Sequence, residues 1–286
     1  METIVRELRH KIIGLRITGF WSDKEKPFAQ SGGVSIFKKE IKGKKVLSVE
    51  RRAKFIVVDI EGDKALFIHQ KLSGHLLYGK WMKKNGLWQS NINGPLRDDR
   101  KNQYIRYVWE FSNSYQLAMS DVRRFSRVIL VKDKDISNLR EIRDLGPEPL
   151  EMSSKEFREL FGKKKGNLKQ VLMDPFFIVG IGNIYSDEIL WDAGFHPLSR
   201  VENLREEDIK KIFVSTVKIL NKAIKAKGSS IDDYRTPSGN KGSYQDMEKA
   251  YQQTGEKCAK KDGGIIKRIK TGGRSAHFCP EHQKKI

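Results

Sequence analysis

The segment Leu145-Gly146-Pro147-Glu148-Pro149-Leu150 separates two parts of the sequence that differ in periodicity. Two prolines this close together remove backbone N–H donors and fix φ, so the segment fits neither a helix interior nor a central strand. The sequence before it has short apolar or alternating runs, and the sequence after it has apolar residues at helical spacing. We therefore predict that the domain boundary lies here.

The part before this segment predicts an all-β domain with one leading helix. Ile4, Val5, Leu8 and Ile12 recur at helical spacing from the start, and no capping Ser, Thr, Asp or Asn precedes Met1. After this helix the apolar runs are short and separated by turn residues. The runs that we predict as strands are 46–49, 55–60, 65–68, 105–111, 116–119 and 128–131.

The part after the segment predicts helices first and a hairpin last. The helical periodicity covers 157–161, 168–173, 184–193 and 209–226. The stretch 228–242 is polar, with little to bury, so we expect a mobile loop. Near the end, 265–269 and 276–279 predict two strands joined by a Gly-Gly turn, with Arg274 at the tip.

The composition points to a polyanionic partner. The 286 residues include 56 Lys and Arg against 36 Asp and Glu, a net charge of +20. Nucleic acid and an anionic membrane surface both fit such an excess. No apolar run approaches the roughly 20 residues of a bilayer span, and the start lacks a secretion signal. We expect a cytoplasmic, nucleoid-associated protein without a membrane partner.

The two cysteines, Cys258 and Cys279, are too few for a disulfide framework. Reduced thiols or metal ligands fit better.

Four motifs resemble one family, the formamidopyrimidine-DNA glycosylase and endonuclease VIII family. They are HQKLSG at 69–74, SDVRRF at 120–125, LGPEPL at 145–150 and GIGNIYSDEIL at 180–190. They occur in the family order, and the resemblance is collinear from Glu2 to about His282.

The resemblance implies the fold class and the activity. The fold is an α+β multidomain protein with an N-terminal β-sandwich and leading helix, a helix-two-turn-helix domain, and a C-terminal β-hairpin like a zinc finger. The expected domains are 1–133, a linker over 134–150, the helical domain over 151–228, and the lesion-capping loop with a degenerate finger over 229–286. The implied activity is excision of oxidised purines from double-stranded DNA with cleavage of the abasic strand, by a monomer.

The family context gives several residues a role in holding DNA. Asn183 enters a helix after Gly180-Ile181-Gly182, where backbone amides can face a phosphate, although such turns also serve as helix caps. Lys163 and Lys169 resemble positions that face DNA, against the alternative of a solvated lysine surface. His69 rests on its motif alone, because a single histidine is more often structural.

Three residues resemble those that fill the gap left by an extruded nucleotide. Arg123 and Phe125 follow a strand, and a planar cation with an aromatic ring suits a wedge. The alternative is that Phe125 belongs to the core and the arginines pair with Asp121. Leu72 stands where the purine-lesion branch more often has methionine, and its similar bulk keeps a void-filling role.

The catalytic set is incomplete. Lys54 resembles the lysine of the lesion site, although a lysine after two arginines is also a common surface charge, and Arg274 resembles the finger arginine that grips the phosphate. The family opens with a nucleophilic proline and an acidic glutamate, and its usual start is Met-Pro-Glu-Leu-Pro-Glu-Val-Glu-Thr. This chain opens Met1-Glu2-Thr3, so Glu2 aligns with the later glutamate. We expect that about five residues are absent because the start is placed too far downstream. Since a helix rises by roughly 1.5 Å per residue, the terminus of this chain would then lie several such steps away from the site.

The finger ligands are also altered. The family pattern is two CxxC pairs, whereas here Lys261 follows Cys258 at the next ligand position, and Cys279 is followed by His282. Cys258, Cys279 and His282 are one ligand fewer than a closed zinc site uses. His277 or Asp262 could complete the set, and a hairpin without metal is an equal alternative.

Two other functions stay open on the sequence. A non-catalytic protein that binds damaged DNA would keep Asn183, Arg123 and Phe125 without the nucleophile. An architectural nucleic-acid-binding module would not require Lys54 or the loop at 228–242.

Overall fold

The structure is a computed structural model that describes residues 1–25, 28 and 31–286. The described chain forms two compact units, which we treat separately. The first comprises Met1–Arg143 and Ala226–Gln245, and the second comprises Asp144–Lys225 and Asp246–Ile286. The loop at 228–242 therefore belongs with the N-terminal unit, and the four-part division expected from the sequence stays a prediction.

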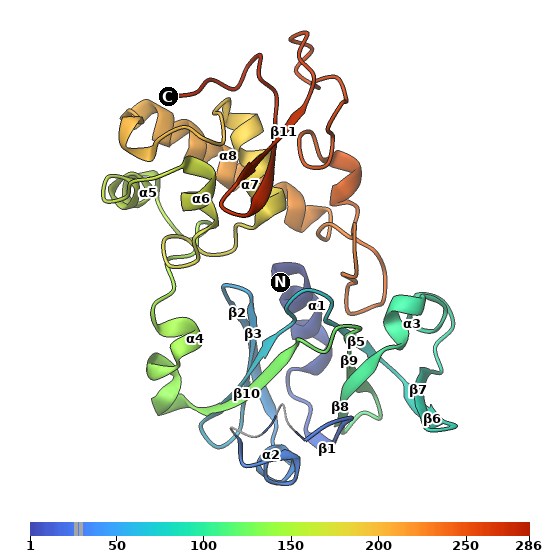
Figure 1. Cartoon of the computed structure of the whole chain (residues 1–286). Helices are drawn as coiled ribbons and strands as arrows, with labels where there is room; N and C mark the ends of the chain where they lie inside the picture. The colour runs from blue at the N-terminus through green and yellow to red at the C-terminus, as the bar shows by residue number, and fades with distance from the viewer. Residues whose placement is uncertain (26–27, 29–30) are drawn as a thin grey trace. The chain divides into compact units, whose positions relative to one another are not determined.

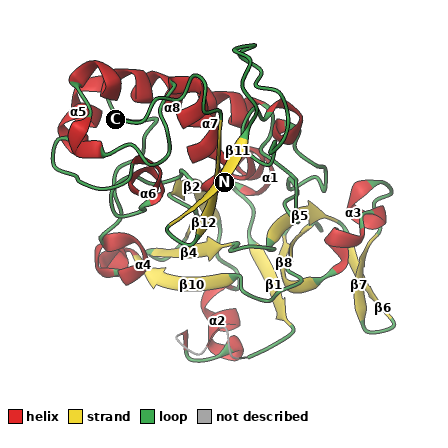
Figure 2. Ribbon diagram, turned by 45° about the horizontal axis from the view of Figure 1, so that its top comes forward, coloured by secondary structure: helices red, strands yellow, loops and turns green. Residues whose placement is uncertain are grey.

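The first unit contains two four-stranded antiparallel sheets, whose strands are yellow in Figure 2. The strands are β1 (Ile17–Ser22), β2 (Val46–Arg52), β3 (Phe55–Ile60), β4 (Lys64–His69), β5 (His75–Gly79), β8 (Ile105–Phe111), β9 (Gln116–Ser120) and β10 (Arg127–Lys132). One sheet has the order β1-β8-β9-β5 and the other β10-β4-β3-β2. A separate hairpin pairs β6 (Trp81–Lys84) with β7 (Leu87–Ser90).

The two sheets share one hydrophobic core with α1 (Glu2–Ile12) and α2 (Val34–Ile41), as in a β-sandwich (Figure 1). The unit also contains α3 (Pro95–Asp98) and α4 (Arg140–Arg143), with 3-10 turns η2 (Arg100–Gln103) and η3 (Asp133–Asn138). Leu8 of α1, Phe37 of α2, Ile56 of β3 and Trp109 of β8 are almost fully buried in this core. Each such side chain stabilises the fold by about 1.5–3 kcal/mol, so α1 is held by its apolar face and needs no N-cap.

The second unit is helical and ends in a hairpin. Its elements are α5 (Ser154–Phe161), α6 (Leu168–Met173), α7 (Asn183–Ala193), η4 (Val201–Asn203), α8 (Glu206–Lys225), β11 (Lys267–Thr271) and β12 (Arg274–Phe278), and η5 (Tyr244–Met247) lies at the junction of the units. A capping box between Ser153 and Glu156 starts α5. Glu188 of α7 accepts the backbone N–H groups of residues 249–251, which fixes the chain that leads to the hairpin.

The predicted fold class is confirmed, and most predicted elements agree within two residues at their ends. The sequence-based prediction missed the strands β1, β5, β6 and β7 and the helices α2, α3 and α4. Every residue of β5 is buried, so it has no alternation to reveal a strand. The first hairpin strand is 267–271 rather than 265–269, because Ile266 packs in a small core beside Cys279 and the polar residues after it form the ladder.

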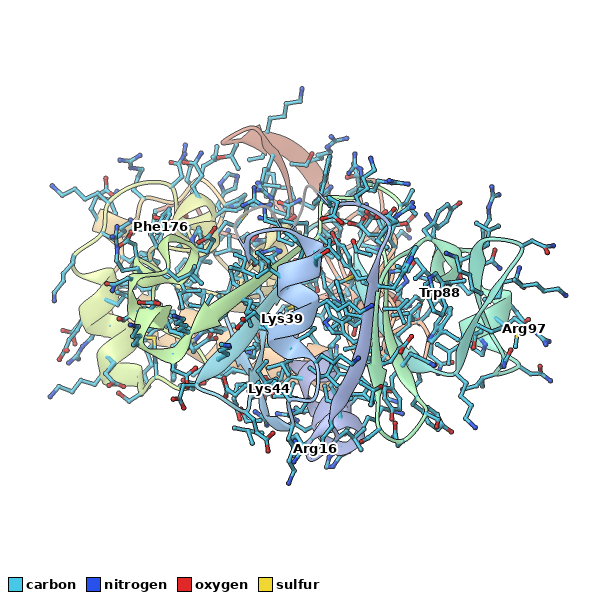
Figure 3. All side chains as sticks on the ribbon, turned by 90° about the horizontal axis from the view of Figure 1, so that it is seen from below. Arg16, Lys39, Lys44, Trp88, Arg97 and Phe176 are labelled. Carbon is cyan, nitrogen blue, oxygen red and sulfur yellow. The ribbon has the colours of Figure 1, made fainter. Side chains whose placement is uncertain are left out.

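Basic side chains also lie far from the residues expected to bind DNA. Figure 3 labels Lys39 on α2, Lys44 just before β2, and Arg16. Lys44 precedes the start of β2, and Lys54 follows its end. The excess positive charge is therefore spread over the first unit and not confined to one site.

Among the helices of the described residues, none combines the length and the apolar character that crossing a bilayer requires.

Phe157 tests the helical core. It is fully buried and lies 4.7 Å from the Phe161 ring and 5.2 Å from the Phe213 ring, measured between centroids. We expect Phe157→Ala to lower the free energy of unfolding of the second unit by about 3–5 kcal/mol, because it leaves a cavity. The measurement is urea denaturation. Phe176→Ala is the control, since Phe176 is 65% exposed (Figure 3), and an equal loss in both variants would contradict this packing.

Candidate DNA-binding site and metal-ligand cluster

Lys54 lies in the turn between β2 and β3. Ala53 before it has a φ of 53°, which turns the chain sharply. The Lys54 side chain is exposed. Its charge acts on both the α-amino group of Met1 and the ring of His69, so these three groups lie at one end of the sandwich.

The α-amino group of Met1 is buried in this chain. Burial lowers its pKa to about 6, and the charge of Arg51 adds to the effect. Glu2 does not face this amine as a free acid. Its carboxylate accepts hydrogen bonds from Arg6 Nε at 2.8 Å and Arg51 Nε at 2.9 Å. Although burial opposes ionisation, these two bonds hold the pKa of Glu2 below its usual value, which agrees with the expectation that Glu2 is not the catalytic acid.

His69 ends β4 and its ring packs edge-on against Phe55 at 4.7 Å. Burial lowers the pKa of His69 to about 4, helped by the charges of Lys71 and Lys54. Nδ1 accepts the backbone N–H of Lys71 at 2.9 Å, which assigns the proton of the neutral ring to Nε2. His69 at neutral pH is thus a hydrogen-bond donor and not a cation.

Two turns that are joined by hydrogen bonds carry Leu72, Arg123 and Phe125. The buried Asp121 carboxylate accepts the Ser73 hydroxyl and the backbone N–H of Arg123 at 3.1 Å. These bonds join the turn that carries Leu72 to the turn that carries Arg123 and Phe125. Burial raises the pKa of Asp121, but the hydrogen bonds from Ser73 and Ser126 outweigh it and keep the carboxyl ionised.

The three side chains point into solvent. Leu72 is 67% exposed and Phe125 is 54% exposed, so Phe125 is not a core residue. The Arg123 guanidinium lies over the Phe125 ring at 5.7 Å. Asp121 accepts backbone N–H groups near these residues, such as that of Ser126. The guanidinium of Arg124 forms an ion pair with Asp23 at 3.1 Å. Exposed apolar side chains on a rigid turn are what insertion between bases requires.

In the second unit, Asn183 is the first residue of α7 and follows the Gly180-Ile181-Gly182 turn. Gly180 has a φ of 85°, which only glycine adopts easily. Among the described residues, Asn183 Oδ1 is buried and has no hydrogen-bond partner. The backbone N–H groups at this helix N-terminus are chemically suited to a phosphate, whereas the unpaired Oδ1 is itself an acceptor.

Lys163 and Lys169 differ in exposure. Lys163 is exposed after α5. Lys169 is only 1% exposed, and its ammonium donates to Asp187 Oδ1 and to the backbone carbonyl of Ser275, both at 2.6 Å. Two buried acceptors thus bind the Lys169 ammonium, and the predicted contact of Lys169 with DNA stays a prediction.

Arg274 opens β12 directly after the Gly272-Gly273 turn, and its side chain is exposed. The base of the hairpin is tied to α7. Asp187 Oδ2 accepts the backbone N–H of His277 at 3.0 Å and lies 2.9 Å from its ring Nδ1. His277 is therefore bound to Asp187 and is not available to complete the metal set.

Asp262 completes that set. One ligand atom each from Cys258, Asp262, Cys279 and His282 lies within 4.8 Å of all the others. Lys261, which replaces the family cysteine, has a φ of 57°, and the turn there brings the next residue, Asp262, into the cluster.

The donor set suits zinc. Two sulfurs, one nitrogen and one oxygen can form a tetrahedral site. His282 turns Nδ1 towards the cluster, and its Nε2 lies 3.0 Å from the carbonyl of Trp191, the arrangement usual for a metal-bound histidine. The hydrogen bond from the backbone N–H of Gly264 is the largest effect on Asp262 and lowers its pKa to about 2. This ligand is therefore ionised. Burial raises the pKa of Cys279 to about 11 without a metal, so binding would release a proton.

The sequence reasoning overlooked the acidic residues that position the others. Asp187 and Glu188 lie inside the quoted motif GIGNIYSDEIL, where acidic residues beside apolar ones are a signal of buried hydrogen-bond acceptors, and the sequence indicates Asp121 only as a partner of the arginines.

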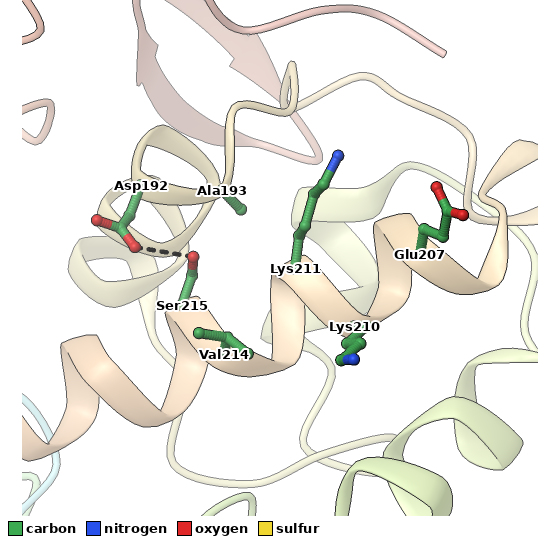
Figure 4. A pocket seen from close by; sticks show the side chains of 7 residues that line it. All are labelled: Asp192, Ala193, Glu207, Lys210, Lys211, Val214 and Ser215. Carbon is green, nitrogen blue, oxygen red and sulfur yellow. Dashed lines mark hydrogen bonds between the residues drawn. The ribbon is translucent and has the colours of Figure 1, made fainter.

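A surface hollow of about 500 Å³ lies on α7 and α8 (Figure 4). Its side chains include Val214 and Lys211, and Asp192 accepts a hydrogen bond from Ser215 at 2.8 Å. None of the predicted site residues lines it, so we do not assign the site there.

The fold combines a β-sandwich that carries exposed residues on two turns with a helical unit that carries a glycine-rich turn and a C-terminal hairpin, which fits the class of DNA glycosylases. The chain belongs to the formamidopyrimidine-DNA glycosylase family. The family's N-terminal domain model matches residues 1–128, and its H2TH domain model matches 145–235.

Similar proteins cover the full length. The chain is 31% identical to the formamidopyrimidine-DNA glycosylase of Pelotomaculum thermopropionicum, over 99% of this chain and 97% of the relative. It is 33% identical to that of Solibacter usitatus, over 100% and 98%. Among solved structures, Lactococcus lactis Fpg in complex with DNA that contains an abasic site has a TM-score of 0.83 at 32% identity, covering 99% of this chain and 98% of that one.

Zinc binding can be measured directly. We expect about one zinc per chain by elemental analysis at neutral pH, and loss of zinc as the pH falls, because protons compete for the thiolates and His282. Asp262→Asn should weaken binding by at least about tenfold, whereas His277→Gln should leave the stoichiometry unchanged. Equal effects of the two variants would contradict the assigned ligand set.

His69 gives a pH prediction. The unfolded chain binds a proton at His69 below pH 6.5, but the folded chain does so only below about pH 4. The unfolded state therefore binds more protons in this window, and stability should fall as the pH drops from 6.5 to 4. In His69→Gln the fall should be smaller, by at most about 1.4 kcal/mol per pH unit. Urea unfolding across this range checks it, with exposed His10→Gln as control; identical slopes in parent and His69→Gln would refute the assignment.

Proposed function

We propose that this protein is a base-excision-repair DNA glycosylase that removes oxidised purines, such as 8-oxoguanine and formamidopyrimidines, with abasic-site lyase activity. The observation that carries the proposal is the family match, by domain models over residues 1–128 and 145–235 and by relatives along 99% of the chain, in which all four quoted motifs are present. It is further supported by solved relatives, since Lactococcus lactis Fpg was solved with DNA that contains Fapy-dG, at 31% identity.

The proposed roles follow from chemistry. Lys54 and Arg274 serve the elimination steps, since both are exposed cations that a sugar-phosphate can reach. Asn183 and Lys163 hold phosphates, and His69 donates to the DNA backbone as a neutral ring. Arg123, Phe125 and Leu72 fill the space of the extruded nucleotide, as exposed groups on a rigid turn.

The DNA partner and the cell compartment complete the proposal. The protein acts as a monomer on double-stranded DNA that contains a damaged base, inside the cell and at the nucleoid. The net charge of +20 supports a strong, salt-dependent attraction to the duplex. The loop at 228–242 covers the extruded base.

A second function is favoured by one observation. The second residue is Glu2, and it is paired with Arg6 and Arg51 rather than placed as an acid. The second candidate function is therefore a protein of the same fold that binds damaged DNA without excising the base.

Borohydride trapping on duplex DNA with 8-oxoguanine separates the two functions. We compare the 286-residue chain with a form in which Pro-Glu-Leu-Pro-Glu-Val stands in place of Met1. We expect a covalent adduct with the proline form, because a neutral secondary amine attacks C1′ and borohydride reduces the Schiff base. The adduct is measured as a shifted band on a denaturing gel.

The control is the same duplex with an undamaged guanine, which should give no adduct. An adduct with the 286-residue chain alone would assign the chemistry to Met1. Absence of adduct with both forms would sink the lyase activity, and tight lesion binding without adduct would favour the binding protein.

A further inference from the structure

The loop at 228–242 is held in place, contrary to the mobile loop expected from its polar sequence. Arg235 and Thr236 are 4% and 2% exposed. Within the loop, Thr236 N donates to Asn240 O at 2.9 Å, and Gly239 N donates to Thr236 O at 2.8 Å. Polar residues order here because their hydrogen-bonding groups are paired, which composition alone does not reveal.

The strongest contact joins Arg235 to Asp99, the residue between α3 and η2. Arg235 Nε donates to Asp99 Oδ2 at 2.6 Å, and a second guanidinium nitrogen donates to the carbonyl of Tyr234 at 2.8 Å. Burial opposes ionisation of Asp99, but the bonds from Arg235 and from the N–H of Lys101 outweigh it and lower its pKa. The Lys101 ammonium also pairs with Asp233.

A second contact is made by Asn102 of η2, which is fully buried. Its Nδ2 donates to Gly239 O at 3.2 Å and to Pro95 O at 2.7 Å, and its Oδ1 lies 3.0 Å from Nε2 of the buried His75. A Cβ on Gly239 would lie 2.9 Å from the backbone N of Leu96, and the φ of Gly239 is +83°. The loop can approach α3 this closely only because residue 239 is glycine.

Other contacts fasten the same loop to the sandwich. Tyr78 N of β5 donates to Pro237 O at 2.7 Å, and the Ser238 hydroxyl bonds to Glu7 of α1. The loop is therefore tied to several elements of its own unit, with the partly buried Asp99 as its side-chain acceptor and the buried Asn102 as its side-chain donor.

We propose that residues 95–103 form a clamp that orders the 228–242 loop before DNA binds, so that the enzyme meets the extruded base with a preformed cover. This inference rests on the proposed function, in which the loop covers the base. A loop that must order on binding loses conformational entropy at that moment, whereas a clamped loop has already lost it during folding. Asp99, Arg235, Asn102 and Gly239 are thus positioning residues for lesion recognition.

The first test is amide hydrogen exchange of the full DNA-free chain, read at Thr236, Gly239 and Gly242. These amides should exchange slowly in the parent and at least about tenfold faster in Asp99→Asn and Arg235→Gln, because each variant removes a charge-assisted hydrogen bond. The double variant should be no faster than the faster single variant. Asp135→Asn is the control, since Asp135 is an exposed aspartate of η3 outside the clamp, and it should leave exchange unchanged.

Gly239→Ala provides a second route that leaves all charges in place, and should accelerate the same amides by displacing the loop from α3. Unchanged exchange at Val58 of β3 shows that each variant is folded. Fast exchange of the loop amides in the parent, or equal exchange in parent and clamp variants, would overturn the clamp.

The second test measures dissociation constants for two duplexes, one with a non-excisable 8-oxoguanine analogue and one with tetrahydrofuran, which has no base to cover. The clamp variants should weaken the first about tenfold and the second by less than about twofold. Equal weakening of both would overturn the positioning role. A different result would separate the two claims. If the loop amides of the parent exchange slowly but the parent binds the lesion no better than undamaged DNA, the proposed function is refuted and the clamp is not.

Discussion

Asp187 is fully buried on α7, and both oxygens of its carboxylate are engaged. One accepts the ammonium of Lys169, and the other accepts the backbone N–H of His277 in β12. Because Lys169 also donates to the carbonyl of Ser275, the carboxylate fixes the strand that begins with Arg274. A buried charge is costly unless it is paired and fully hydrogen-bonded, so this arrangement permits few alternative positions of the hairpin.

The same device recurs wherever a candidate functional residue lies on a loop. Asp121 joins the turn of Leu72 to the turn of Arg123 and Phe125, and Glu188 holds residues 249–251 ahead of the finger. Asp99 does the same for the loop at 228–242. In each case an acidic side chain replaces the missing ladder or helix bonds of an irregular segment. This strongly basic protein thus keeps cations such as Lys54 and Arg274 exposed, and uses buried or partly buried carboxylates to hold its irregular segments.

Much of the fold could be predicted because it depends on local periodicity. The spacing of Ile4, Leu8 and Ile12 fixes α1, and the run 105–111 fixes β8 to the residue. The prediction failed for β5, which is buried along its whole length, and for the hairpin register, where apolar Ile265 and Ile266 suggested a strand two residues too early. The candidate site residues were predicted through motifs, and the sequence did not show that Lys169 is buried or that Asp262, rather than His277, joins the metal-ligand cluster.

The sequence by itself determined the charge, the order of the α and β parts, the break at residues 145–150 and the set of residues available for DNA binding. These properties depend on composition and on neighbours along the chain. Only the tertiary structure decided which polar groups face solvent and which are paired inside, because that choice joins residues far apart in sequence, such as Asp99 with Arg235 and Asp187 with His277. A polar loop is mobile or ordered according to those distant partners, and its own sequence does not contain them.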